Sequence, residues 1–187
     1  ENKSSQARRL CFVGWLHPRK GLIHLLESFE MLVMENANIT LEVAGTGTLS
    51  QDLEESAQNP AMKDRLTFHG WMSNPMTLIA QCDLLIVPSL GDSFPEVIGE
   101  ALYVGTPVIG SRVGGIPEQL KYDELLFAPG NAEALAKKLR VIIESGDQYQ
   151  LIRKYCALRR IALTFDWGAE LNSLLYAILK PRESSGD

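Results

Sequence analysis

The sequence predicts an α/β domain whose core is a doubly wound, parallel sheet of six strands. Two observations predict this class: short apolar runs alternate with amphipathic segments up to Asn131, and the pattern beyond that residue is helical only. Strands that are almost continuously apolar indicate a parallel sheet covered on both faces. A chain of 187 residues can bury one such core, since a domain of about 150 residues buries about 70% of its unfolded surface.

The expected strands are short runs rich in β-branched or aromatic residues, each bounded by Gly, Pro, Ser or Asp. They are 10–14, 39–44, 66–69, 84–87, 107–110 and 125–128.

The expected helices follow from apolar residues spaced three and four apart, such as Leu22, Leu25, Leu26, Phe29 and Leu32. Further helical segments are 49–56, 75–81, 95–104, 117–120, 132–144, 149–163 and 167–179. Within 149–163, an apolar stripe predicts the packed face: Leu151, Tyr155, Leu158 and Ala162. We therefore expect a linker at 1–9, one domain at 10–180 that includes the helices of 131–180, and a polar tail at 181–187.

Composition excludes several classes of protein. With 45% hydrophobic and 22% charged residues, the chain has the balance of a soluble globular domain, not of a disordered chain or a coiled coil. Its net charge of −5, from 18 basic and 23 acidic residues, disfavours a dedicated nucleic-acid binder. Cys11, Cys82 and Cys156 show neither disulfide nor metal spacing. With no run of about 18 apolar residues, we expect a cytoplasmic location.

The loops that follow the strands are the places to look for a ligand, because helix N-termini there present free N–H groups to anions. The first loop sets Arg19 and Lys20 at the start of a helix, where the helix dipole would favour an acid. This placement indicates a bound anion such as a phosphate. The alternative is a solvated surface pair, with Pro18 starting the helix.

Glycines mark two further loops. Gly45 and Gly47 follow the second strand, and no acid ends the next strand, so the fingerprint of a dinucleotide cofactor fails and NAD is disfavoured. These glycines either let a ligand approach the backbone or form a tight turn. Gly114 and Gly115 could form a backbone nest for an anion.

Two acids, Asp92 and Glu100, flank seven residues around the start of the fourth helix. We predict that Ser93 caps this helix with Glu96 as its reciprocal partner, which sets Asp92 just before the helix. Glu100 stands among apolar residues, where a carboxylate needs donors, and the vicinal hydroxyls of a ribose would supply two. A Glu100 that faces water is the alternative.

Taken in order, these motifs resemble the C-terminal, donor-binding half of a GT-B glycosyltransferase of retaining family 4, also called glycosyl transferases group 1. The ordered set is Phe12-Val13-Gly14 with Lys20-Gly21, Val43 to Gly47, Phe68 to Trp71, Pro88-Ser89, Asp92 with Glu100, Gly105 to Ile109, Gly114-Gly115 with Glu118, and Leu126-Phe127 with Pro129-Gly130. Phe165-Asp166-Trp167 with Leu175-Tyr176 is similar to the family's closing helix. The resemblance implies a Rossmann-like half of a GT-B fold with additional C-terminal helices.

The resemblance also implies site residues. Lys20, with Arg19, would hold the donor pyrophosphate and neutralise the departing nucleoside diphosphate, which makes Lys20 and Asp92 the catalytic candidates, without a certain general base. Glu100 would hold the ribose, and Asp92 the donor sugar.

Backbone groups complete the implied site. Amides of 93–96, from Ser93, Phe94, Pro95 and Glu96, would bind sugar hydroxyls or phosphate. The backbone of Gly70, Trp71 and Met72 would receive the nucleobase, and Gly14 would let the phosphates approach. No metal and no cofactor are implied beyond the nucleoside-diphosphate sugar itself.

Two residues depart from the family pattern. Trp15 stands where the family usually has Arg, so one phosphate contact is either missing or replaced by Arg19. Asp92 stands where the first acid is usually Glu, so its carboxylate reaches one methylene less far.

The expected function is transfer of a sugar from a nucleoside-diphosphate sugar with retention, in bacterial surface polysaccharide synthesis. The alternative is a non-catalytic nucleotide- or phosphate-binding module. Expected partners are the N-terminal GT-B domain of the full-length protein, without which transfer would be poor, and a glycan or lipid-linked acceptor. The excess of basic residues over 131–165 indicates a solvated helix face or, as the minority alternative, weak association with the inner face of a membrane.

Overall fold

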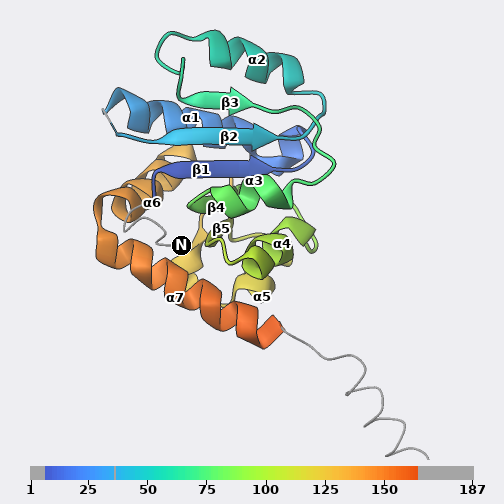
Figure 1. Cartoon of the computed structure of the whole chain (residues 1–187), viewed down its shortest axis with the longest axis vertical. Coiled ribbons are helices and arrows are strands. Elements are labelled where there is room, and N and C mark those ends of the chain that lie inside the picture. The colour runs from blue at the N-terminus through green and yellow to red at the C-terminus, as the bar shows by residue number, and fades with distance from the viewer. Residues whose placement is uncertain (1–6, 36, 164–187) are drawn as a thin grey trace, which may run out of the picture.

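Six parallel strands form the sheet in the computed structural model, which describes residues 7–35 and 37–163. Their order is β3-β2-β1-β4-β5-β6, so β1 and β4 are neighbours although far apart in the sequence. The strand bounds are β1 Arg9–Val13, β2 Thr40–Ala44, β3 Leu66–Phe68, β4 Leu84–Val87, β5 Val108–Ser111 and β6 Leu126–Phe127. All carboxyl ends meet at one edge, toward which the arrows of β1, β2 and β3 point in Figure 1.

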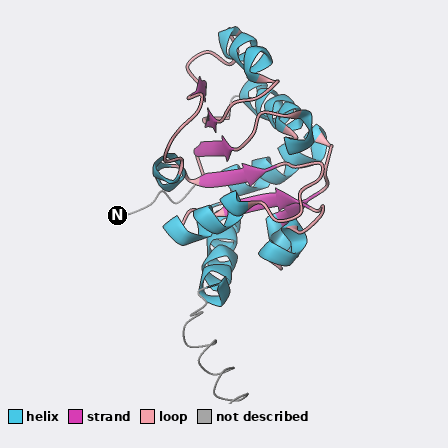
Figure 2. Ribbon diagram, turned by 90° about the vertical axis from the view of Figure 1, so that its right-hand side faces the viewer, coloured by secondary structure: helices cyan, strands magenta, loops and turns pink. Residues whose placement is uncertain are grey.

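Helices cover the sheet on both sides (Figure 2). Helix α1 packs against α6, α3 packs against α4, and α7 contacts α4, α5 and α6. The bounds are α1 Leu22–Met34, α2 Ser50–Gln58, α3 Met76–Gln81, α4 Glu96–Val104, α5 Ile116–Leu120, α6 Ala132–Glu144 and α7 Gly146–Leu163. Two 3-10 turns, η1 Pro18–Lys20 and η2 Asp123–Leu125, were not predicted as separate elements.

The predicted periodicities set the core. All four residues of β4 are buried, and α1 buries Leu22, Leu25, Phe29 and Leu32 at helical spacing. The six strands are confirmed, with bounds that differ from the prediction by one residue at most ends. The predicted helix 167–179, the tail 181–187 and most of the linker 1–9 lie outside the described residues.

The packed face of α7 was predicted only in part, because Tyr155 of the predicted stripe is partly buried against the core but the most buried residues are others. Its buried residues are Tyr149, Ile152 and Cys156, whereas Leu158 and Ala162 of the predicted stripe are exposed. The buried residues also lie at helical spacing, so the sequence offers two overlapping apolar stripes, and the Tyr149 hydroxyl of the buried one donates to the Asp83 carbonyl at 2.9 Å.

The turn after β5 packs directly on the turn after β4. The Gly115 N–H donates to the Asp92 carbonyl at 3.0 Å, and a Cβ on Gly115 would overlap the carbonyl oxygen of Ser93. Gly114 has φ +55° and lies against the same backbone, at Asp92. The glycine pair therefore permits close approach of two loops, and one of its amides is already engaged by protein instead of an external anion.

A matched pair of Gly→Ala variants tests this packing. Gly115→Ala should lower the free energy of unfolding by about 1–3 kcal/mol, because the added methyl displaces the 92–93 backbone. Gly99→Ala, in the interior of α4 with open space around it, should instead raise it by about 0.5–1 kcal/mol. Urea unfolding of both variants measures the difference; equal effects would show that the loop contact is not tight.

Candidate functional site

The candidate site lies where the strand order reverses. The loops that leave β1 and β4 start side by side and lead to helices on opposite sides of the sheet, since β1 leads on to β2 and β4 leads on to β5. Such a switch point leaves a crevice beyond the carboxyl ends of the two strands. The loops that follow β1 and β4, 14–21 and 88–95, therefore build the site.

A short 3-10 turn, η1, shapes the first loop. His17 caps it, with its Nδ1 accepting from the Arg19 N–H at 3.2 Å, and Gly21 ends it at φ +70°. A Cβ on Gly21 would overlap the Pro88 carbonyl, and the Leu90 N–H donates to the Arg19 carbonyl at 2.8 Å. Backbone contacts thus hold the β1 and β4 loops together.

An ion pair joins the two predicted catalytic residues. Lys20 Nζ lies 2.6 Å from Asp92 Oδ2, and the side chains of Lys20 and Asp92 are only 23% and 11% exposed. The Ser89 hydroxyl lies 3.4 Å from the same carboxylate oxygen. A cation at this helix start is therefore balanced by a protein carboxylate. Arg19, its predicted companion, is exposed on η1.

The predicted capping box at α4 is wrong. The residue before the helix is Pro95, with extended dihedrals and no side-chain cap, so neither Ser93 nor Glu96 has the predicted role. A proline disfavours helical dihedrals in the residue before it, so Phe94 is a poor first residue for the helix, and α4 begins at Glu96, after Pro95. Ser93 and Phe94 are exposed, Pro95 is buried, and Glu96 is exposed in the first turn.

Glu100 is half-buried on α4, two residues before the buried Leu102. Burial raises the pKa of the Glu100 carboxyl above its ordinary range, and the nearby Glu96 carboxylate raises that pKa further. Among the described residues no hydrogen-bond donor is recorded for it. Its carboxylate thus has free acceptor capacity, which fits both the ribose hypothesis and the alternative that Glu100 faces water.

An open pocket of about 250 Å³ brings together three other predicted residues, Gly14, Trp71 and Met72. It lies at the carboxyl ends of β1 and β2 and the start of α3. Its remaining lining residues are Val13, Trp15, Ala44, Gly45, Thr46 and Pro75, none of them charged. Gly70 precedes this lining with φ +66° and turns the chain into it. Trp15, Thr46 and Pro75 were not predicted as site residues.

Backbone hydrogen bonds hold the walls of this pocket. Gly14 donates to Ala44, Leu16 donates to Thr46 at 2.9 Å, and Gly45 donates to Gly70 at 2.8 Å. A Cβ on Gly45 would overlap the Gly14 carbonyl. The Gly-x-Gly motif therefore admits the first loop's backbone, and Gly45 faces the pocket from that position.

A buried carboxylate braces the same loops from the sheet. Glu42 Oε1 lies 2.8 Å from Arg9 Nε, and Glu42 Oε2 lies 2.7 Å from His69 Nε2. These contacts link β1, β2 and the residue before Gly70. The signal that could have revealed them is Glu42, the one charged residue in strand 39–44.

The structure does not bring every predicted residue to one cavity. The Phe94 side chain lines a separate cavity of about 560 Å³ with Tyr103 and Leu163, between α4 and α7. Any donor contact at Phe94 would therefore come from its backbone, as the resemblance implies.

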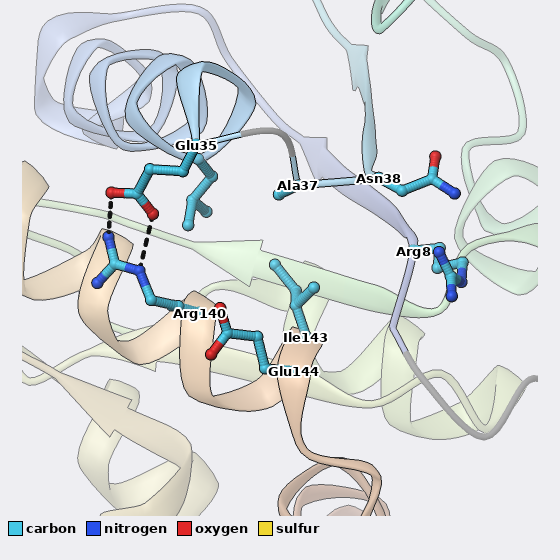
Figure 3. A pocket seen from close by; sticks show the side chains of 8 residues that line it. Arg8, Glu35, Ala37, Asn38, Arg140, Ile143 and Glu144 are labelled. Carbon is cyan, nitrogen blue, oxygen red and sulfur yellow. Dashed lines mark hydrogen bonds and ion pairs between the residues drawn. The ribbon is translucent and has the colours of Figure 1, made fainter.

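Another cavity, of about 280 Å³, lies near the amino ends of β1 and β2 (Figure 3). Arg140 of α6 donates there to Glu35 after α1, with Nε to Oε2 at 2.8 Å and Nη2 to Oε1 at 2.6 Å. This hydrogen-bonded pairing lowers the pKa of Glu35. The cavity contains none of the predicted donor residues.

Within residues 7–35 and 37–163, no cluster of three His, Cys, Asp or Glu side chains could hold a metal ion. In the same part of the chain, no helix has the length and hydropathy needed to cross a membrane.

Comparison with known sequences gives partial matches to glycosyltransferases. An uncharacterized glycosyltransferase of Methanocaldococcus jannaschii is 29% identical over 133 residues, which are 69% of this chain and 34% of that protein. The 2-deoxystreptamine glucosyltransferase of Streptomyces kanamyceticus is 29% identical over 71% of this chain and 35% of its own. A glycogen synthase of Mycobacterium tuberculosis is 27% identical over 84% of this chain and 39% of its own. The chain thus spans little more than a third of these relatives.

Solved structures share the fold. TarM of S. aureus superposes with a TM-score of 0.78 at 15% identity, over 92% of this chain and 36% of that chain. HepE of Anabaena, solved in complex with UDP, gives 0.74 at 20% identity, over 92% and 49%. The C-terminal domain of a group 1 glycosyl transferase of Francisella tularensis gives 0.73 at 19% identity, over 83% and 85%. The predicted fold class, a six-stranded α/β half of a GT-B fold, is confirmed.

The family profile described as "Glycosyl transferases group 1" matches residues 1–158, which is most of the chain. Its span includes the switch-point loops, the Lys20–Asp92 ion pair and Glu100. The chain belongs to the glycosyl transferases of group 1.

Proposed function

We propose that this chain is the C-terminal, donor-binding half of a retaining family 4 glycosyltransferase, and that it binds a nucleoside-diphosphate sugar at the switch point. The observation that carries the proposal is the placement of Lys20 and Asp92 in contact, 2.6 Å apart, next to the crevice between β1 and β4. A half-buried lysine at the mouth of this crevice is suited to a diphosphate.

The three charged side chains have separate roles in this proposal. Lys20 stabilises the negative charge that grows on the departing diphosphate, a kind of electrostatic stabilisation that contributes several kcal/mol in enzymes. Asp92, released from Lys20 by the incoming phosphates, contacts the donor sugar. Glu100 accepts from the ribose hydroxyls. No metal and no other cofactor belong to this proposal.

The acceptor in this proposal rests on the resemblance to the family. Two of the named relatives, a 2-deoxystreptamine glucosyltransferase and a glycogen synthase, differ in acceptor while both transfer sugars. This favours a shared donor site here and acceptor contacts from an N-terminal domain. We infer a glycan or lipid-linked acceptor in bacterial surface polysaccharide synthesis, and poor transfer by the chain alone.

Calorimetry tests the donor site directly. Titration with UDP, GDP and ADP, and with their sugar conjugates, should show micromolar to millimolar binding of one nucleoside diphosphate. Binding of none of them would overturn the proposal.

Lys20→Ala should weaken diphosphate binding at least tenfold, which is about 1.4 kcal/mol, because it removes one charged hydrogen bond. Arg19→Ala, a neighbouring cation that is exposed, is the matched control and should have the smaller effect. Equal losses would contradict the special role of Lys20.

Asp92→Asn should act in opposite directions on two ligands. It removes the carboxylate that competes with phosphate for Lys20, so the free diphosphate should bind up to about fivefold tighter, which is about 1 kcal/mol. The sugar conjugate should lose affinity relative to the free diphosphate, because its sugar contact is gone. Thermal melting of the variant checks that the fold survives, and parallel losses for both ligands would refute the competition.

Binding should weaken as the pH falls through the raised pKa of Glu100. Ribose hydroxyls donate to the ionised carboxylate, so the ligand binds that form and lowers its pKa in the complex. Because the ligand titrates too, the readout is the association constant of the wild type divided by that of Glu100→Gln. This ratio should decrease as the pH is lowered. Glu96→Gln removes a repulsive charge and should move that fall to lower pH. A ratio that stays constant with pH would show that Glu100 does not contact the ligand.

A further inference from the structure

Two exposed tryptophans border the uncharged pocket beside the switch point. Trp15 follows β1 and is 53% exposed, and Trp71 follows β3 and is 73% exposed. Both line the same open space of about 250 Å³. Large aromatic side chains usually bury most of their surface, so two exposed indoles beside one pocket indicate a ligand-binding surface.

The Trp15 ring is held in place. It stacks on His17 with ring centroids 4.4 Å apart and planes 21° apart, and the His17 Nδ1 accepts from the Arg19 N–H. The next residue, Leu16, is fully buried and its N–H donates to the Thr46 carbonyl. An aromatic plane fixed in this way loses little conformational entropy when a ligand stacks on it.

The rest of the lining defines the chemistry. Gly14 and Gly45 contribute no side chain, Val13, Ala44, Met72 and Pro75 are apolar, and Thr46 offers the only hydroxyl among the lining residues. No cation lines the pocket, so it does not suit a phosphate. A flat, uncharged ring that stacks on an indole fits its shape and polarity.

From this lining we propose that Trp15 is a base-stacking residue that, with Trp71, forms an aromatic cleft for the nucleobase of the donor. This inference rests on the proposed function and adds a side chain that the family pattern does not supply, because Arg is usual at this position. The phosphates lie at Lys20, and the base lies against Trp15.

Comparison of a nucleoside diphosphate with inorganic pyrophosphate separates contacts to the base from contacts to the phosphates. Trp15→Ala should weaken whichever of UDP, GDP and ADP the wild type binds by about tenfold, the size expected for loss of one stacked base. The affinity of Trp15→Ala for inorganic pyrophosphate should stay within twofold of the wild-type affinity. Trp15→Phe should retain most of the affinity. Tyr103→Ala, which removes an aromatic on α4 that is 73% exposed, should have no effect.

Fluorescence gives an independent readout. Nucleotide should quench the wild-type tryptophan emission, and Trp15→Phe should lose part of that quenching while it still binds. Base stacking is refuted, and the proposed function stands, if the wild type binds a nucleotide and Trp15→Ala binds it equally well. It is also refuted if Trp15→Ala loses as much affinity for pyrophosphate as for the nucleotide. If the wild type binds no nucleotide, the proposed function itself fails.

Discussion

The Lys20–Asp92 ion pair depends on one topological fact, the adjacency of β1 and β4. The two residues are 72 positions apart, and they meet because the strand order reverses between these neighbours. The backbone contacts of Gly21 with Pro88 and of Leu90 with Arg19 set the spacing of the loops that carry them. The charge arrangement of the site is therefore a property of the sheet, and neither loop would create it alone.

The ion pair also explains how a cationic site can exist without a ligand. A lysine only 23% exposed would pay a desolvation cost without a counter-charge, and Asp92 supplies that charge on the protein. A diphosphate carries more charge than one carboxylate and offers more acceptor oxygens. In the proposed function, exchange of Asp92 for phosphate would therefore keep Lys20 balanced at each stage and would free Asp92 only when a donor is present.

Sequence reasoning succeeded where one physical signal dominates. The strands are apolar because both faces are covered, so their number and positions could be predicted to within about a residue. It failed where two signals compete. At α4 the serine suggested a cap, but Pro95 stands directly before the helix. At α7 two apolar stripes at helical spacing compete, and the one that contains Tyr149, Ile152 and Cys156 is buried.

Candidate residues could be named from sequence, but their groupings could not. Glycines 45 and 47 are compatible with ligand approach or with chain packing, and only the position of the first loop shows that packing uses them. The same contact determines what Trp15 can do. Leu16 is buried against the second loop, whereas its neighbour Trp15 is exposed and lines the pocket that Gly45 and Trp71 share. Trp15 in place of the family's usual Arg removes a cation from the first loop. In this fold it also supplies an aromatic side chain to the lining of the pocket.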